Sequence, residues 1–471
     1  MADSLGNGQS RKRGSAARQR HARRRFLARF LRAGVGALGT ASGIPALAQR
    51  QEGAKPKMRV EIARHALDKV PLSLIIDDST VLINLNYFWM RERNPVDGQN
   101  RRWEDVPVVH PEFFTREFAE FCLENGVRGK FTIVPYPAAV ARVDRPLPLF
   151  SKAQYESWLN MCRELIVPAF DINPEMLTHT IVLDPKTFKP LEPQIWEQYE
   201  WQTLPTDKEE LVYEYIRTAC QILANIGLPP EGVTSPGGFG GRTLEFYAKV
   251  AGEAVRSVTG NSTPYFFKRV SSKGKVETPV WYPDRNRGTA VGEIIASTGD
   301  WTGSWTGYGE ADADKYITAD LKQGRLVEVI AAGDPAVMCS HWQGFYGLHN
   351  DDRRGFNVLQ TVVSRLKQLD PRGERTAWRK CSEITNYACA RELATVSAQN
   401  NTITLDLPLR VPEFTLKITG VQVRGVAVDG VALREVHSRA QFNSGTFYRE
   451  GDTTLLAFDP KQRKVRVEVY A

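Results

Sequence analysis

The sequence predicts an α/β protein built as a (β/α)7-like barrel, followed by a C-terminal all-β sandwich domain. Over residues 66–394, apolar strand-like runs alternate with amphipathic helical patterns, which is the order of βα units around a parallel sheet. About seven such units suit a barrel better than an open sheet. Over residues 398–471, short alternating strands separated by Gly, Asp and Pro turns replace this pattern, and they predict the sandwich.

Residues 1–48 have the pattern of a twin-arginine export signal. Arg23, Arg24 and Arg25 precede Phe26 and Leu27, and a weakly apolar, Gly- and Ala-rich run ends at Ala-Leu-Ala, residues 46–48. This order of basic residues, apolar run and small-residue exit is typical of a cleaved signal. We therefore expect a periplasmic or secreted protein, with a disordered basic tail as the alternative.

The elements of the barrel follow one another in a regular order. The strands are expected at residues 72–78, 129–135, 176–180, 264–268, 291–297 and 336–341. The helices are expected at residues 111–125, 152–167, 207–226, 244–258, 313–330, 356–369 and 378–390. A Gly-rich segment at 234–241 reads as a tight turn at the rim of the barrel.

Charge and hydropathy exclude two classes of partner. Ten of the 62 Lys and Arg residues, but one of the 54 acidic residues, lie in residues 1–48, so the rest of the chain is close to neutral. A nucleic-acid partner therefore loses its main support, which was the excess of positive charge. No segment approaches the ~20 consecutive apolar residues that a membrane span requires, so no stable membrane anchor is expected. The six cysteines show no CxxC spacing, and Cys122, Cys162 and Cys220 fit buried helix positions.

Two adjacent carboxylates, Asp77 and Asp78, close the first predicted strand. Ligands of parallel α/β folds gather at the carboxyl ends of the strands, and two charges there are too costly to serve packing alone. Because side chains alternate along a strand, one carboxylate can face the barrel mouth and the other the rim. This separation favours a base at one position and a ligand at the other, with a solvated strand-end turn as the alternative.

Two histidines occupy equivalent places in the predicted order. His179 ends the expected strand 176–180, and His341 ends the strand 336–341. A single histidine beside an apolar strand is usually a satisfied core residue. Together with the two aspartates, however, histidines at strand ends favour metal or proton chemistry.

Five short motifs between residues 70 and 385 follow the order found in the polysaccharide deacetylase (NodB-like) family. They are Ile76-Asp77-Asp78, Thr178-His179-Thr180, Pro236-Gly237-Gly238, Asp300-Trp301 and Ser340-His341. The chain resembles a divergent member of that family. The resemblance implies that Asp77 is the general base, that Asp78 and His179 are ligands of a divalent metal such as Zn²⁺, and that His341 is the general acid.

The chain departs from the family pattern at two positions. The family has a second metal-binding histidine four residues after the first, and here that residue is Leu183, which cannot bind a metal. The third family motif supplies an arginine that orients the base, and the matching residue is Thr234. Asp184 could replace the lost ligand only in a rebuilt loop, so the metal site is incomplete on sequence alone.

Aromatic residues crowd the loops that are expected to follow the strands. Flat rings at a rim suit the apolar faces of sugars, and Trp301 and Trp342 are the candidates for substrate binding. Anchoring of loops is the alternative for any single ring. The three clusters are Trp196, Tyr199 and Trp201; Trp301, Trp305 and Tyr308; and Trp342, Phe345 and Tyr346.

These observations favour an exported, deacetylase-like hydrolase that acts on a polysaccharide or glycoconjugate. Two alternatives stay open: a glycan-binding protein of the same fold that has lost its metal and its activity, and a metal-independent enzyme that cleaves glycosidic bonds on the same barrel.

Overall fold

The fold is described from a computed structural model, which covers residues 57–80, 109–347 and 352–471. The predicted signal, residues 1–48, lies outside the described residues. Within the described part of the chain, no helix is both long and apolar enough to cross a membrane.

The first sheet of the α/β domain carries the candidate aspartates. Strands β3 and β9 both pair in parallel with β2, whose last residue, Asp77, lies opposite His341 at the end of β9. Strand β4 extends the sheet beyond β3, and the short β10 pairs with the start of β2. The bounds are β2 (Val70–Asp77), β3 (Gly129–Ile133), β4 (Phe170–Pro174), β9 (Ala336–His341) and β10 (Thr376–Trp378).

The second sheet of this domain has the order β5-β6-β8-β7, in which β7 alone is antiparallel to its neighbour. Its strands are β5 (Gly232–Thr234), β6 (Tyr265–Val270), β7 (Val280–Asp284) and β8 (Thr289–Ala296). The predicted runs 264–268 and 291–297 match β6 and β8.

The two sheets share a small apolar core but do not form one closed sheet among the described residues. Ile75 of β2, Phe267 of β6, Ile294 of β8 and Val337 of β9 belong to one buried cluster. Isolated bonds link the sheets at two seams: a bridge joins Glu175 to Thr234, and the N–H of Ser297 donates to Val337 O at 2.7 Å. The structure is thus mixed α/β with several sheets, and a closed barrel stays a prediction.

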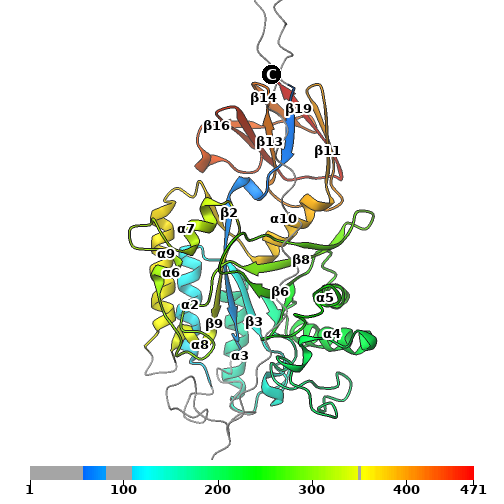
Figure 1. The fold of residues 1–471 in the computed structure, drawn as a ribbon, viewed down its shortest axis with the longest axis vertical. Helices are drawn as coiled ribbons and strands as arrows, with labels where there is room; N and C mark the ends of the chain where they lie inside the picture. The colour runs from blue at the N-terminus through cyan, green and yellow to red at the C-terminus, as the bar shows by residue number, and fades with distance from the viewer. Residues whose placement is uncertain (1–56, 81–108, 348–351) are drawn as a thin grey trace, which may run out of the picture. The chain divides into compact units, whose positions relative to one another are not determined.

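Long amphipathic helices pack around these sheets (Figure 1). The helices predicted at 111–125, 207–226, 244–258 and 356–369 correspond to α2, α4, α5 and α9, and the one predicted at 152–167 runs as α3 into a short π-helix at Cys162–Ile166. The bounds are α2 (Glu112–Asn125), α3 (Lys152–Met161), α4 (Glu209–Asn225), α5 (Leu244–Thr259), α8 (Trp342–Tyr346), α9 (Arg354–Leu369) and α10 (Cys381–Leu393).

The helix predicted at 313–330 is wrong as one element. The structure has two short helices there, α6 (Ala313–Tyr316) and α7 (Arg325–Ala331). Gly324 between them has φ +102°, and a Cβ on it would lie 2.6 Å from the carbonyl oxygen of Tyr316. The chain leaves α6 in extended backbone at Ile317 and enters α7 directly after Gly324, at a close approach that only a residue without a side chain fits.

The strand predicted at 176–180 is also wrong. The strand of this region is β4, which ends at Pro174, and the next residues form consecutive bends. Met176 and His179 have φ of +48° and +64°, which extended backbone cannot adopt. His179 therefore lies in a loop after the strand and not on it.

The C-terminal part forms two five-stranded sheets around a second core, here called the β-module. One sheet has the order β1-β13-β18-β17-β16 and the other β11-β12-β19-β14-β15, and Leu416, Leu456, Leu405 and Val467 belong to the buried cluster that both share. The strands are β1 (Arg59–Ile62), β11 (Thr395–Gln399), β12 (Thr402–Asp406), β13 (Phe414–Thr419), β14 (Gly425–Val428), β15 (Val431–Ala432), β16 (Arg434–Val436), β17 (Thr446–Glu450), β18 (Thr453–Phe458) and β19 (Lys464–Tyr470).

The β-module also takes in chain from outside the predicted range 398–471. Strand β1 precedes the whole α/β domain in sequence and pairs antiparallel with β13. Helix α10 belongs to both parts: Cys381 and Ile384 join the core between the two α/β sheets, whereas Tyr387 and Ala390 join the core of the β-module. The two parts are therefore packed on a common helix.

Candidate functional site

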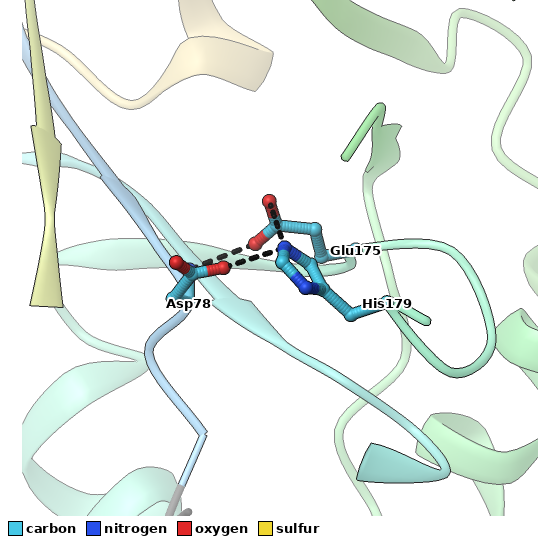
Figure 2. Close-up of side chains that lie close together, drawn as sticks. All are labelled: Asp78, Glu175 and His179. Atoms are coloured by element: carbon cyan, nitrogen blue, oxygen red, sulfur yellow. Dashed lines mark hydrogen bonds and ion pairs between the residues drawn. The ribbon is translucent and has the colours of Figure 1, made fainter. Parts of the chain in front are cut away.

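Two acidic side chains and one histidine converge just beyond the ends of β2 and β4. They are Asp78, Glu175 and His179, all buried, and one ligand atom of each lies within 4.8 Å of the others (Figure 2). His179 Nε2 is 2.8 Å from Asp78 Oδ1 and 3.5 Å from Glu175 Oε1. Two carboxylates and an imidazole nitrogen at this spacing form a donor set that suits a divalent metal.

Neighbouring polar groups fix both carboxylates of the cluster. The N–H of Asp78 and the hydroxyl of Thr132 both donate to Glu175 Oε2, at 2.8 and 2.9 Å. Gln343 Nε2 donates to Asp78 Oδ2 at 3.0 Å. In each carboxylate, one oxygen accepts these hydrogen bonds and the other oxygen faces His179.

One atom of this cluster supports the fit to a cation. Asp78 Oδ1 is buried, and the contact the structure gives it among the described residues is the 2.8 Å ion pair with His179 Nε2. A cation held between the carboxylates would satisfy the same oxygen in place of the charged histidine. The residues present therefore fit a divalent ion.

In the metal-free site, electrostatics favour a charged Asp78 and a protonated His179. Burial alone would raise the pKa of Asp78, but His179 and Gln343 hold it well below its usual range. Burial alone would lower the pKa of His179, but Asp78 and Glu175 hold it well above its usual value. The site thus has a strong preference for positive charge between its carboxylates.

Asp77, the candidate base, lies beside this cluster and is paired with a buried lysine. Lys130 Nζ of β3 is 2.5 Å from Asp77 Oδ1, and the Lys130 side chain is fully buried. The ammonium group also lies 4.7 Å from the centre of the Phe267 ring. Burial raises the pKa of Asp77 to about 6, with Lys130 opposing the rise and Glu175 adding to it.

His341, the candidate acid, is oriented by a third carboxylate. His341 Nδ1 lies 2.7 Å from Asp300 Oδ2, and the hydroxyl of Thr302 donates to the other oxygen of Asp300 at 2.7 Å. Burial would lower the pKa of His341, but the hydrogen bond and charge of Asp300 raise it to about 10. His341 and Asp77 are register partners on adjacent parallel strands, so their side chains share one face of the sheet.

The aromatic candidates differ in how much surface they offer. Trp301 directly follows Asp300, is half-buried and packs edge-on against Tyr316. Trp342 is 1% exposed and packs among Phe114, Phe118 and Phe131. The expected exposed ring at Trp342 is therefore not present. Of the three predicted aromatic clusters, Tyr199 and Trp305 are the exposed members.

The structure adds two residues to the site that the sequence analysis did not single out, Glu175 and Lys130. Leu183, at the position of the lost ligand, is buried in the main hydrophobic core, and Glu175, four residues before His179, lies beside Asp78 and His179 as a third potential ligand. Asp184 holds its own turn through Lys186 and Thr187 and takes no part in the cluster. Lys130 contacts the base in place of the lost arginine. Of these two residues, Lys130 could have been noticed in the sequence, because a lysine is unusual inside the apolar run 129–135.

Comparisons with known proteins add no assignment. No family model matches the chain, and no curated protein matches it. Solved structures with distant likeness include an Anoxybacillus α-amylase (8% identity, 86% of this chain and 99% of that one, TM-score 0.31) and a Thermotoga maritima α-fucosidase (10% identity, 87% and 95%, TM-score 0.28). A family 39 glycoside hydrolase from Bacteroides cellulosilyticus has 9% identity over 87% of this chain and 82% of that one, with a TM-score of 0.19. Likeness at this level carries no argument about fold or activity.

Proposed function

We propose that this chain is a metal-dependent hydrolase that removes an acyl group, most simply acetyl, from a polysaccharide or glycoconjugate outside the cytoplasm. The observation that carries the proposal is the convergence of Asp78, Glu175 and His179 beside Asp77 and His341. The carbohydrate substrate, the export and the closed barrel rest on the sequence motifs. The two seam bonds between the sheets are consistent with a barrel-like arrangement.

In this proposal Asp78, Glu175 and His179 hold the divalent ion. When bound, the ion would act as a Lewis acid that polarises the acyl carbonyl and stabilises the negative charge that develops on its oxygen. Asp77, held by Lys130, accepts a proton from the attacking water. His341, held protonated by Asp300, donates a proton to the leaving nitrogen or oxygen as the acyl C–N or C–O bond breaks. The products are the acid and the free amine or hydroxyl.

The first test is metal content and acyl release by the purified full chain. We expect one equivalent of metal by elemental mass spectrometry, and release of acetate from acetylated oligosaccharides that stops after chelation and returns with Zn²⁺ or Mn²⁺. Glu175→Ala should lose the metal, because two remaining side-chain ligands hold an ion weakly. Asp184→Asn is the matched control and should keep it, since Asp184 lies outside the cluster.

The variant Asp77→Asn separates chemistry from metal binding. It should retain the metal and lose activity by about 100-fold or more, because a positioned base contributes about that factor. A wild-type chain that binds no metal, or a Glu175→Ala variant that retains it, would contradict the proposed centre. A metal-loaded chain that binds glycans and releases no acid would favour the binding protein instead.

A further inference from the structure

We infer that Lys268 and Arg242 bind a carboxylate of the substrate, which makes the proposed substrate an acidic glycan, one that contains uronic acids. The inference rests on the hydrolase proposed above and names the class of its substrate. Both cations lie at two loops that are bonded to each other, residues 198–202 and 236–242, here called the paired loops. The first of these loops also contacts His179.

Backbone hydrogen bonds fix the paired loops to each other and to the candidate metal site. The N–H of Gly238 donates to the carbonyl oxygen of Gln198 at 2.9 Å. The N–H of Arg242 donates in the same way to Gln202, also at 2.9 Å. Gln198 Nε2 in turn lies 2.9 Å from the carbonyl oxygen of His179. The side chains that the paired loops carry are therefore close to a substrate bound at the metal centre.

A β-bulge places Lys268 against the second of these loops. Where β6 pairs with β8, the register shifts between Phe267 and Arg269, so Lys268 is the extra residue of the bulge. Bulges redirect a side chain and are frequent beside active sites. Lys268 Nζ donates to the carbonyl oxygen of Gly237 at 2.8 Å. The ammonium group thus lies near the carboxyl end of a parallel strand, where the ligands of α/β folds gather.

The two cations are without an acidic partner in the part of the chain that the structure describes. Arg242 is exposed, and Lys268 is partly buried. Burial lowers the pKa of Lys268 below its usual value, and no described carboxylate opposes this effect. The carbonyl oxygen of Gly237 takes one of the three N–H donors of the ammonium group. Because a partly buried charge without a counter-charge is costly, an anion that arrives with the ligand explains this position better than packing does.

The acidic residues next to and within the first of the paired loops are already engaged. Glu197 is buried and accepts from Thr178 and Tyr215. Glu200 accepts the N–H of Trp196 at 2.6 Å. The charge that these loops offer to a ligand is therefore positive. A carboxylate fits it better than a sugar hydroxyl, since charge-assisted hydrogen bonds are about twice as strong as neutral ones.

The experiment measures the affinity of the full chain for two probes without acyl groups, by isothermal titration calorimetry. One probe is an oligogalacturonate, and the other is a neutral xylo-oligosaccharide of the same length. The wild type should bind the oligogalacturonate more tightly, and high salt should reduce this preference because it screens charge. Lys268→Met should weaken oligogalacturonate binding by about 10-fold, since it removes a charge-assisted hydrogen bond, and should leave binding of the neutral probe within about twofold. Lys268→Arg should restore most of the loss.

Lys273→Met is the matched control, because it removes the same charge from an exposed residue shortly after β6. It should change neither affinity by more than about twofold, since an exposed charge away from the ligand contributes little. Arg242→Gln covers the case in which Lys268→Met does not fold. Arg242 is exposed, so its removal should leave the fold intact and weaken oligogalacturonate binding by about threefold or more.

Equal affinity of the wild type for the two probes overturns the inference, as does an equal loss of oligogalacturonate binding in Lys273→Met. Loss of both probes in Lys268→Met would show a structural role and overturn it as well. Neither probe can release acid, so this test is separate from that of the hydrolase. If the chain binds oligogalacturonate through Lys268 but releases no acetate from acetylated glycans, the proposed hydrolase fails and the acidic ligand stands. If it releases acetate and binds both probes equally, the hydrolase stands and this inference fails.

Discussion

At the scale of single residues, the pair His341–Asp300 sets the alkaline limit of the proposed reaction. His341 must be protonated to act as an acid, and Asp300 raises its pKa to about 10. We expect kcat/KM to stay level through neutral pH and to fall as pH rises through about 10. Asp300→Asn removes the charge that holds the proton, so the fall should begin at least about 2 pH units lower. If kcat/KM of Asp300→Asn still falls only near pH 10, His341 is not the general acid.

The buried pair of Lys130 and Asp77 makes a prediction about stability. Breaking a buried ion pair from one side leaves an unpaired charge and costs about 3–5 kcal/mol, whereas replacing both partners costs much less. Lys130→Met should therefore lower the free energy of unfolding by about that amount, and the double variant Lys130→Met with Asp77→Asn should recover most of it. Urea unfolding of the four proteins in this cycle measures the coupling. Additive losses would show that the pair is not formed.

At the scale of elements, the loop that carries His179 depends on a buried carboxylate from the following loop. Glu197 accepts the N–H of Thr178 at 2.8 Å, and it also accepts the hydroxyls of Thr178 and Tyr215. These bonds hold the bends between β4 and His179, where Met176 and His179 have positive φ. The position of the histidine is therefore determined outside its own segment.

Removing the Glu197 carboxylate should loosen this loop and weaken the metal site. Glu197→Leu leaves the N–H of Thr178 and the hydroxyl of Tyr215 without the acceptor that they share, so we expect Zn²⁺ affinity to fall by about 10-fold or more, with a loss of about 2–3 kcal/mol of stability. Glu197→Gln keeps an acceptor of the same shape and should stay within a few-fold. Isothermal titration with Zn²⁺ compares the two variants. Similar Zn²⁺ affinities of Glu197→Leu and the wild type would show that the loop keeps its conformation without the Glu197 carboxylate.

The elements also show which parts of this site a sequence can predict. The strand predicted at 336–341 matches β9, and those predicted at 72–78 and 129–135 overlap β2 and β3 with ends that differ by about two residues, so Asp77 and His341 end their strands as predicted and Asp78 directly follows β2. Nothing local marks Glu175 as a ligand, because it reaches His179 only through bends that Glu197 imposes from 20 or so residues away along the chain. The helix predicted at 313–330 failed because the chain becomes extended at Ile317 and re-enters a helix only after Gly324, whose φ of +102° accompanies a close approach to the backbone of Tyr316.

At the scale of the whole described chain, the segment between β1 and β2 joins the β-module to the α/β domain. Arg64 donates to Asp334 Oδ1 at 2.6 Å and to the carbonyl oxygen of Gly333 at 2.8 Å. His65 Nε2 lies 2.9 Å from the same carbonyl oxygen. Because β1 itself belongs to a sheet of the β-module, these bonds connect the two parts through a few polar contacts, in addition to the shared helix α10.

This junction should make the protein sensitive to mild acid. Burial lowers the pKa of His65 to about 4, aided by the charges of Arg64 and Arg391 and opposed by the hydrogen bond to the carbonyl oxygen of Gly333 and, less, by Asp68. A pKa that is depressed in the folded state contributes stability that is complete above the unfolded value of about 6.5. That contribution is lost as pH falls from about 6.5 through 4.

His65→Gln tests this link, since glutamine can donate to Gly333 O but does not titrate. Between pH 7 and pH 4 the wild type should lose about 2 kcal/mol more of its unfolding free energy than His65→Gln does, because each unit of pKa shift corresponds to about 1.4 kcal/mol and the ring is only partly buried. Urea unfolding at both pH values gives the two losses, and the acid response of the carboxylates is common to both proteins. Equal losses would mean that His65 is already free to take up its proton in the folded protein, and that the junction between β1 and β2 does not hold the histidine as the geometry implies.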